Sequence, residues 1–220
     1  MTADNNLLEH NPPDKAAACM ILLHGLGASG DDLFPLANEL GGLRVVCPNA
    51  PIRAVTLNGG WKMRAWYDIR GLNLEDRQDV QGVEKSQASI ENLLAAEKAR
   101  GFAANKIFLA GFSQGAAMAV YTGLRHVETL AGVIALSGYL LFGDALAGEA
   151  TVANRETPIF QAHGAYDTVV LPPWAQSCHQ QLSTGGWPVE YREYPMAHAI
   201  IPAELADLNR WLKKQIAVIE

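Results

Sequence analysis

The sequence is poor in cysteine, in basic residues relative to acidic ones, and in long apolar runs. Its 220 residues include three cysteines, Cys19, Cys47 and Cys178, whose positions show neither a disulfide framework nor zinc-ligand spacing. The formal net charge is −6 and Lys and Arg form no cluster, which argues against nucleic acid as a partner. No stretch approaches the roughly 18 uninterrupted apolar residues of a membrane span, so stable membrane insertion is not expected.

The first residues, MTADNNLLEHNPPDK, also lack a basic segment followed by an apolar one. Secretory signal peptides show that order, so a cytoplasmic location is expected. The length suits one hydrophobic core, and we expect a single domain over 1–220 with residues 1–15 as a terminal tail or an edge segment.

Apolar runs recur along the chain and alternate with helix-like segments. The runs are nearly continuous in apolar residues, as in parallel strands covered on both faces, and they span 17–25, 43–51, 106–112, 131–138, 157–164 and 188–195. Helical spacing and capping residues mark 29–40, 80–100 and 203–216. The alternation predicts an α/β fold with a mostly parallel, doubly wound sheet and helices on both faces. Residues 52–82 break the alternation and are expected to form a long excursion over one end of the sheet.

Gly111-Phe112-Ser113-Gln114-Gly115 matches the pattern G-x-S-x-G between a strand-like run and a helix-like one. A nucleophile at the tip of such a tight turn needs unusual backbone angles and small neighbours, which the two glycines supply. The structural alternative is a Gly-rich connection with an incidental serine. The strand–turn–helix context favours the catalytic interpretation, so Ser113 is the predicted nucleophile.

A serine nucleophile needs a base and an acid that orients the base, and in this fold they follow the serine in the order acid, histidine. His198 lies in a loop between the last strand and the last helix and is the predicted base. Asp167 follows another strand by three residues and is the predicted acid. His163 is expected to hold that loop by hydrogen bonds, whereas His126 and His179 are expected on the surface.

Acyl transfer also needs donors for the oxyanion. The backbone N–H after the nucleophile, that of Gln114, is one expected donor. The second is expected from the loop after an earlier strand, His24-Gly25-Leu26-Gly27, where glycines let the main chain approach the oxyanion. The predicted second donor is the N–H of Leu26.

The sequence leaves three alternatives to a serine hydrolase. Gly25-x-Gly27-x-x-Gly30 fits the dinucleotide-binding pattern after a strand, but the next strand ends without the acid that this pattern expects. A metal hydrolase would use side chains near one edge of the sheet, with no supporting local spacing: His24, His163, Asp167 and His198. A noncatalytic binding protein of the same fold is disfavoured because all three triad positions are filled.

An ordered set of motifs resembles a known family: Leu23-His24-Gly25-Leu26-Gly27, Asn49-Ala50-Pro51, Trp66-Tyr67-Asp68, the Ser113 motif, His163-Gly164 with Asp167, and His198. Over about residues 8–218 they resemble the acyl-protein thioesterase and lysophospholipase-like carboxylesterases, with the strongest likeness to bacterial carboxylesterase II. The resemblance implies an α/β-hydrolase fold without a large cap domain. It implies hydrolysis of carboxylic esters of short to medium acyl chain, and of thioesters or lysophospholipids as further small-molecule or lipid-like substrates.

The resemblance also implies the triad Ser113, Asp167 and His198, with no metal or organic cofactor, and it leaves room for a homodimer. The excursion 52–82 corresponds to the loop that walls an apolar acyl groove in this family. The candidate groove residues are Trp66, Leu72 and Leu171, with ordinary packing under a long loop as the alternative for each. The sequence departs from the family beside the base, where Ala197 and Ala199 flank His198.

Overall fold

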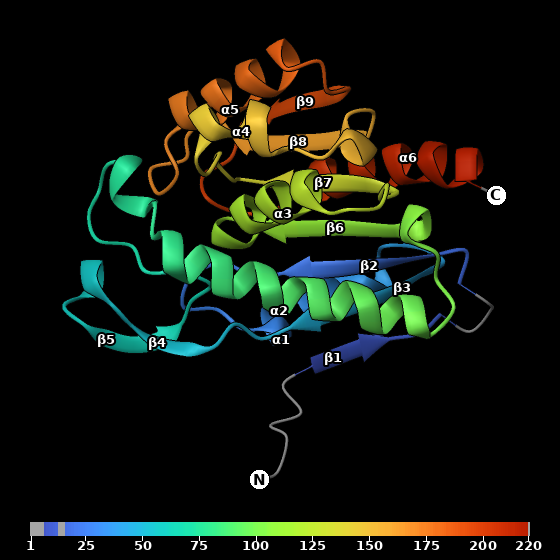
Figure 1. Cartoon of the computed structure of the whole chain (residues 1–220), viewed down its shortest axis with the longest axis horizontal. Helices are drawn as coiled ribbons and strands as arrows, with labels where there is room; N and C mark the ends of the chain where they lie inside the picture. Colours follow the sequence, from blue (N-terminus) through green and yellow to red (C-terminus); the bar gives the residue numbers. More distant parts are fainter. Residues whose placement is uncertain (1–6, 13–15, 220) are drawn as a thin grey trace, which may run out of the picture.

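The computed structural model describes residues 7–12 and 16–219, and in these ranges a seven-stranded sheet has the order β1-β3-β2-β6-β7-β8-β9 (Figure 1). Its strands are β1 (Leu7–His10), β2 (Ala18–Leu23), β3 (Leu43–Pro48), β6 (Ile107–Phe112), β7 (Gly132–Leu136), β8 (Ile159–Gly164) and β9 (Val189–Tyr194). All neighbouring pairs are parallel except β1 with β3. The predicted α/β fold is confirmed.

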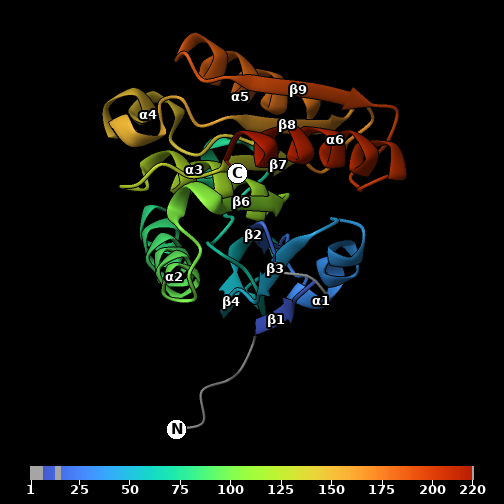
Figure 2. The same cartoon turned by 90° about the vertical axis from the view of Figure 1, so that its right-hand side faces the viewer.

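Helices cover both faces of this sheet, which explains the nearly continuous apolar strands. One face packs against α2 (Val80–Ala99), α3 (Gln114–Arg125), α4 (Gly143–Glu149) and α5 (Pro172–Thr184). The other face packs against α1 (Gly30–Leu33) and α6 (Pro202–Ile219). Figure 2 shows α2 and α1 on opposite sides of the strands. Every residue of β2, β3, β7 and β8 is buried, as parallel strands between two helical layers require.

The sequence predicts one helix over 29–40, but the structure divides this segment into two. α1 ends at Leu33, and Phe34–Asn38 continues as a 3-10 helix. Pro35 has no N–H to bond to the preceding turn, and its ring crowds the carbonyl there, so an α-helix cannot run through this position. The predicted capping is present: Ser29 and Asp32 form a reciprocal capping box at the start of α1.

The expected N-terminal tail or edge segment contains an edge strand. β1 pairs antiparallel with β3, from Leu7 opposite Pro48 to His10 opposite Val45. Residues 1–6 and 13–15 of that segment lie outside the described residues.

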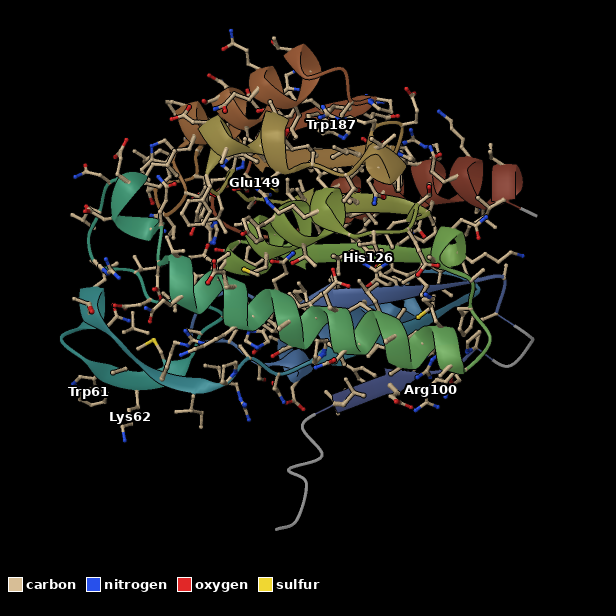
Figure 3. The ribbon with its side chains drawn as sticks, in the orientation of Figure 1. Trp61, Lys62, Arg100, His126, Glu149 and Trp187 are labelled. Atoms are coloured by element: carbon tan, nitrogen blue, oxygen red, sulfur yellow. The ribbon has the colours of Figure 1, made fainter. Side chains whose placement is uncertain are left out.

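The excursion 52–82 begins as a hairpin of β4 (Ile52–Val55) and β5 (Trp61–Arg64), which lies at the end of the sheet where the parallel strands end (Figure 1). A 3-10 turn, Thr56–Asn58, connects the two strands, and a second one, Glu75–Arg77, leads on to α2. Trp61 and Lys62 project outward from the hairpin (Figure 3), and Trp61 is 77% exposed. The excursion therefore reaches the edge of the sheet at which active-site loops gather in open α/β folds.

Among the helices of the described residues, none combines the length and the apolar character needed to cross a bilayer.

Candidate active site

Ser113 occupies the tight turn between β6 and α3, with φ of +56° and ψ of −119°. The flanking glycines are required by close backbone contacts. A Cβ on Gly111 would lie 2.2 Å from the carbonyl carbon of Gly115, and a Cβ on Gly115 would lie 2.2 Å from the carbonyl oxygen of Leu23. The start of α3 therefore rests directly on the ends of β6 and β2, and the turn holds the serine side chain above the sheet.

The structure brings Ser113, His198 and Asp167 together from three loops. The Ser113 Oγ lies 2.9 Å from Nε2 of His198, and Nδ1 of His198 lies 2.7 Å from Oδ2 of Asp167. Asp167 is buried, whereas His198 keeps partial access to solvent. With Nδ1–H donating to the carboxylate, Nε2 is left to accept the hydroxyl proton of the serine.

The loop that carries Asp167 is closed by its own hydrogen bonds. Oδ1 of Asp167 accepts the N–H groups of Val169 (2.8 Å) and Val170 (2.9 Å). Nε2–H of His163 donates to the carbonyl of Val170 at 2.8 Å, as expected for a residue that holds this loop. Burial lowers the pKa of His163, which keeps its ring neutral.

Gly164 lets the loop of the base pass close to the loop of the acid. A Cβ at this position would lie 2.4 Å from the carbonyl oxygen of Met196 and 2.5 Å from that of Ala197. The backbone that leads into His198 thus lies against the end of β8. Close backbone contact fixes the separation of the two loops.

The loop after β2 lies against the nucleophile. A Cβ on Gly25 would come 3.3 Å from the Cβ of Ser113. Among the described residues, the N–H groups of Leu26 and Gln114 donate to no protein acceptor. Two donors next to the serine without protein partners suit a developing oxyanion.

His24 holds this loop rather than facing the nucleophile. Its Nδ1–H donates to the carbonyl of Gly25 (2.7 Å), and Nε2 accepts the N–H of Ala50 (2.9 Å). The ring is fully buried, and burial lowers its pKa. A neutral imidazole with both nitrogens engaged fixes the loop between β2 and α1.

The glycine pattern of this loop is explained by packing and by hydrogen bonds within the protein. The N–H of Gly27 donates to the carbonyl of Arg64 (2.8 Å), and that of Gly30 donates to Oδ1 of Asn49 (2.8 Å). A Cβ on Gly30 would lie 2.6 Å from the carbonyl oxygen of Cys47. The N–H groups that would hold a pyrophosphate therefore already have partners, which counts against the dinucleotide alternative.

The Gln114 side chain contributes a contact that the sequence reasoning missed. Its Oε1 accepts the N–H of Trp66 (2.9 Å), and its Nε2 donates to the carbonyl of Tyr67 (2.9 Å). A buried primary amide can satisfy one peptide donor and one peptide acceptor in this way. The backbone of the excursion is thereby joined to the first residue of α3.

The three candidate groove residues do not gather beside the triad. Trp66 is 2% exposed, and its Nε1–H donates to the carbonyl of His24 at 2.8 Å. It supports the loop of the expected oxyanion donor from within the core. Leu72 is 73% exposed on the outside of the excursion, and Leu171 is 42% exposed at the start of α5. A groove of about 390 Å³ that includes His198 is lined by other residues.

The expectation of a surface position is wrong for His126, which Figure 3 labels. This side chain is 5% exposed, and its Nδ1 lies 2.7 Å from Oε2 of Glu91 on α2. It follows α3, and the contact of α3 with α2 buries it. His179 is half-buried on α5 and stacks on Tyr191 with ring centres 4.8 Å apart.

A model of one protein family, described as phospholipase/carboxylesterase, matches residues 8–216. The chain belongs to this family. A relative in Dictyostelium discoideum, acyl-protein thioesterase 1 homolog 1, is 36% identical over 208 residues, which cover 91% of each chain. Acyl-protein thioesterase 1 of Yarrowia lipolytica is 34% identical over 218 residues, covering 93% of this chain and 95% of the relative.

Solved structures agree with this phospholipase/carboxylesterase assignment. SOBER1 of Arabidopsis thaliana has a TM-score of 0.86 at 28% identity, covering 90% of this chain and 99% of that one. Acyl-protein thioesterase 2 of Zea mays has a TM-score of 0.86 at 28% identity, covering 96% and 98%. The chain is therefore a serine hydrolase of the esterase or thioesterase type, and neither a dinucleotide-binding protein nor a noncatalytic binding protein is favoured.

The metal-hydrolase alternative lacks a ligand cluster in the part of the chain that the structure describes. No three His, Cys, Asp or Glu side chains come together there in a way that could hold a metal ion. Two of the four conceivable ligands, His24 and His163, use ring nitrogens in hydrogen bonds to the backbone.

Proposed function

We propose that Ser113, His198 and Asp167 form the catalytic triad of this phospholipase/carboxylesterase-family enzyme. The observation that carries the proposal is the continuous hydrogen-bonded chain from the Ser113 hydroxyl through the imidazole to a buried carboxylate, with distances of 2.9 Å and 2.7 Å. The base orients the nucleophile and the acid fixes the tautomer of the base.

The reaction has two steps. Oγ of Ser113 attacks the carbonyl carbon while His198 takes the hydroxyl proton, and the N–H groups of Leu26 and Gln114 donate to the oxyanion. His198 then returns the proton to the departing alcohol or thiol. Water activated by His198 hydrolyses the acyl-enzyme and releases the acid.

The substrate class that we propose is a carboxylic ester or thioester with an acyl chain of short to medium length. The names of the two acyl-protein thioesterase relatives support the thioester part of this class. In both substrates the serine attacks an uncharged carbonyl carbon, and His198 protonates the departing oxygen or sulfur. Esters and thioesters therefore share one mechanism. Lysophospholipids fall within the class as lipid-like esters.

A fluorophosphonate probe tests the nucleophile. The wild-type protein should become labelled at Ser113, and the Ser113→Ala variant should lose both labelling and turnover of p-nitrophenyl butyrate, by a factor on the order of 10⁶ in kcat. Ser89→Ala, the same change at an exposed position of α2, should keep both. A Ser113→Ala enzyme with most of its turnover would contradict the proposal.

A further inference from the structure

A groove of about 390 Å³ opens beside His198, on the α1 side of the sheet. Its apolar wall consists of Leu33 and Leu36 before β3, Phe112 next to the nucleophile, and Ala199 and Ile200 after the base. The Phe112 ring also packs on the imidazole, with centres 4.7 Å apart. The groove is therefore continuous with the site of the proposed reaction.

The position of His198 in the wall of this groove decides which part of a substrate can enter it. At the tetrahedral stage the carbon holds the serine oxygen, the oxyanion, the acyl chain and the departing group. The proton on Nε2 of His198 must reach the departing oxygen or sulfur, so this atom has to lie within hydrogen-bond distance of the imidazole. The acyl chain has no such constraint. A cavity that the imidazole itself borders thus accommodates the departing group.

One carboxylate also borders the groove. Asp32 is held by the Ser29 N–H, which donates to its Oδ2 at 2.6 Å. Apart from His198, no other residue that lines the groove in the described part of the chain is titratable or charged. A fixed negative charge at the rim attracts a cation and repels an anion.

We propose that this groove binds the leaving alcohol or thiol of the substrate, and that it favours a departing group with an apolar skeleton that carries a positive charge. The inference rests on the proposed function of Ser113 and His198. It deepens that function because it names the alcohol or thiol part of the substrate as the part that determines specificity. In the acylation step the bond from Ser113 Oγ to the acyl carbon forms and the bond from that carbon to oxygen or sulfur breaks. The serine proton passes through Nε2 of His198 to the departing atom, so no co-reactant is needed.

The first experiment varies each half of the ester separately and compares kcat/KM, because kcat/KM reports steps up to and including acylation. Methyl butyrate and hexyl butyrate differ in the alcohol, whereas methyl butyrate and methyl octanoate differ in the acid. In Leu36→Trp the larger side chain fills part of the groove, so the hexyl-to-methyl ratio should fall by about tenfold or more. The octanoate-to-butyrate ratio should stay within about twofold of wild type.

Leu72→Trp is the matched control, because Leu72 is exposed and lies outside the groove. Both ratios should keep their wild-type values in this variant. If Leu36→Trp does not fold, the same two ratios are measured in Leu36→Ala. It removes apolar contact, so the hexyl-to-methyl ratio should fall by about threefold to tenfold.

The second experiment tests the charge with choline butyrate and its neutral isostere, 3,3-dimethylbutyl butyrate. Asp32→Asn keeps the size and an acceptor for Ser29, so it should lower the choline-to-isostere ratio by about twofold to fivefold. Asp31→Asn removes the same charge from the neighbouring exposed residue, which does not line the groove, and should change this ratio less than Asp32→Asn does.

The proposal is overturned if Leu36→Trp changes the acyl ratio and leaves the alcohol ratio unchanged, or if neither ratio moves. It is also overturned in its charge preference if both Asp variants give the wild-type choline ratio. Failure of the underlying function looks different, because Ser113→Ala would then still hydrolyse every ester in the series.

Discussion

The Gln114 side chain offers a sharp test of how the excursion and the nucleophile turn depend on each other. In Gln114→Ala the backbone N–H expected to face the oxyanion remains, but the hydrogen bonds with Trp66 and Tyr67 are lost. Each buried peptide group left without a partner costs about 1–3 kcal/mol, so the free energy of unfolding should fall by about 2–6 kcal/mol. In a domain of this size, about 2–4 °C of melting temperature corresponds to each kcal/mol. The expected shift is therefore several degrees or more.

The kcat of Gln114→Ala should fall less than that of Ser113→Ala. Removing an oxyanion donor costs about 10²–10³ in kcat, and Gln114→Ala retains its donor, so the loss should stay below about a hundredfold. Thermal melting gives the stability, and p-nitrophenyl butyrate turnover below the melting range gives kcat. Gln176→Ala, an exposed glutamine on α5, is the matched control and should change the free energy of unfolding by less than about 0.5 kcal/mol.

Gln114→Glu separates hydrogen bonding from side-chain size. The carboxylate keeps an acceptor for the Trp66 N–H but places an oxygen against the Tyr67 carbonyl in a buried position. It should destabilise the fold at neutral pH at least as strongly as alanine, because a buried charge that keeps one donor and faces a carbonyl oxygen is costly. A Gln114→Ala protein with wild-type melting temperature, or with activity as low as Ser113→Ala, would refute the reasoning.

Three further predictions concern charged groups. Asp167→Asn should lower kcat by about 10⁴-fold, because the amide cannot stabilise the charged imidazole of His198; a loss below tenfold in p-nitrophenyl butyrate turnover would contradict the assigned role. Glu97→Ala should cost about 3–5 kcal/mol in urea unfolding, because it breaks the buried pair with Arg44 (2.6 Å); a change below 1 kcal/mol would count against the pair. Burial raises the pKa of Glu204 from 4.5 to about 7. Between these pH values the folded state holds a proton that the unfolded state has lost. The free energy of unfolding therefore falls as the pH rises from about 4.5 to about 7. Glu204→Gln should therefore stabilise the protein by up to about 3 kcal/mol at pH 8 and by almost nothing at pH 4.5, and equal gains at both pH values would rule out the titration.

The strands and the triad loops were predictable because their signals are local. A buried parallel strand is apolar over its whole length, and the carboxyl ends of such strands meet at one edge of the sheet. The tight turn at the nucleophile requires small neighbours, and Gly111 and Gly115 meet this requirement in the sequence. With these rules alone, Ser113, Asp167 and His198 are expected at one edge, and the structure has them in hydrogen-bond contact.

The break of the expected helix at Pro35 has a local cause, whereas the other features that the sequence did not specify depend on contacts between distant segments. β1 forms from Leu7–His10, which carries little pattern of its own, because β3 offers an edge with which to pair. Trp66 is distant in sequence from His24, and only the packed fold shows that its indole N–H supports that loop. The groove beside His198 is walled by Leu36 and Ile200 from opposite ends of the chain, and no local periodicity connects them.

The backbone conformation of Ser113 has a consequence for the directed evolution of variants with higher thermal stability. A serine at φ of +56° and ψ of −119° holds a conformation that glycine adopts freely, at a cost on the order of 1–3 kcal/mol. Ser113→Gly should relieve that strain while removing the hydroxyl. A mutant library screened for heat resistance alone would therefore enrich inactive molecules at this position, and a useful screen has to score ester turnover in the same round.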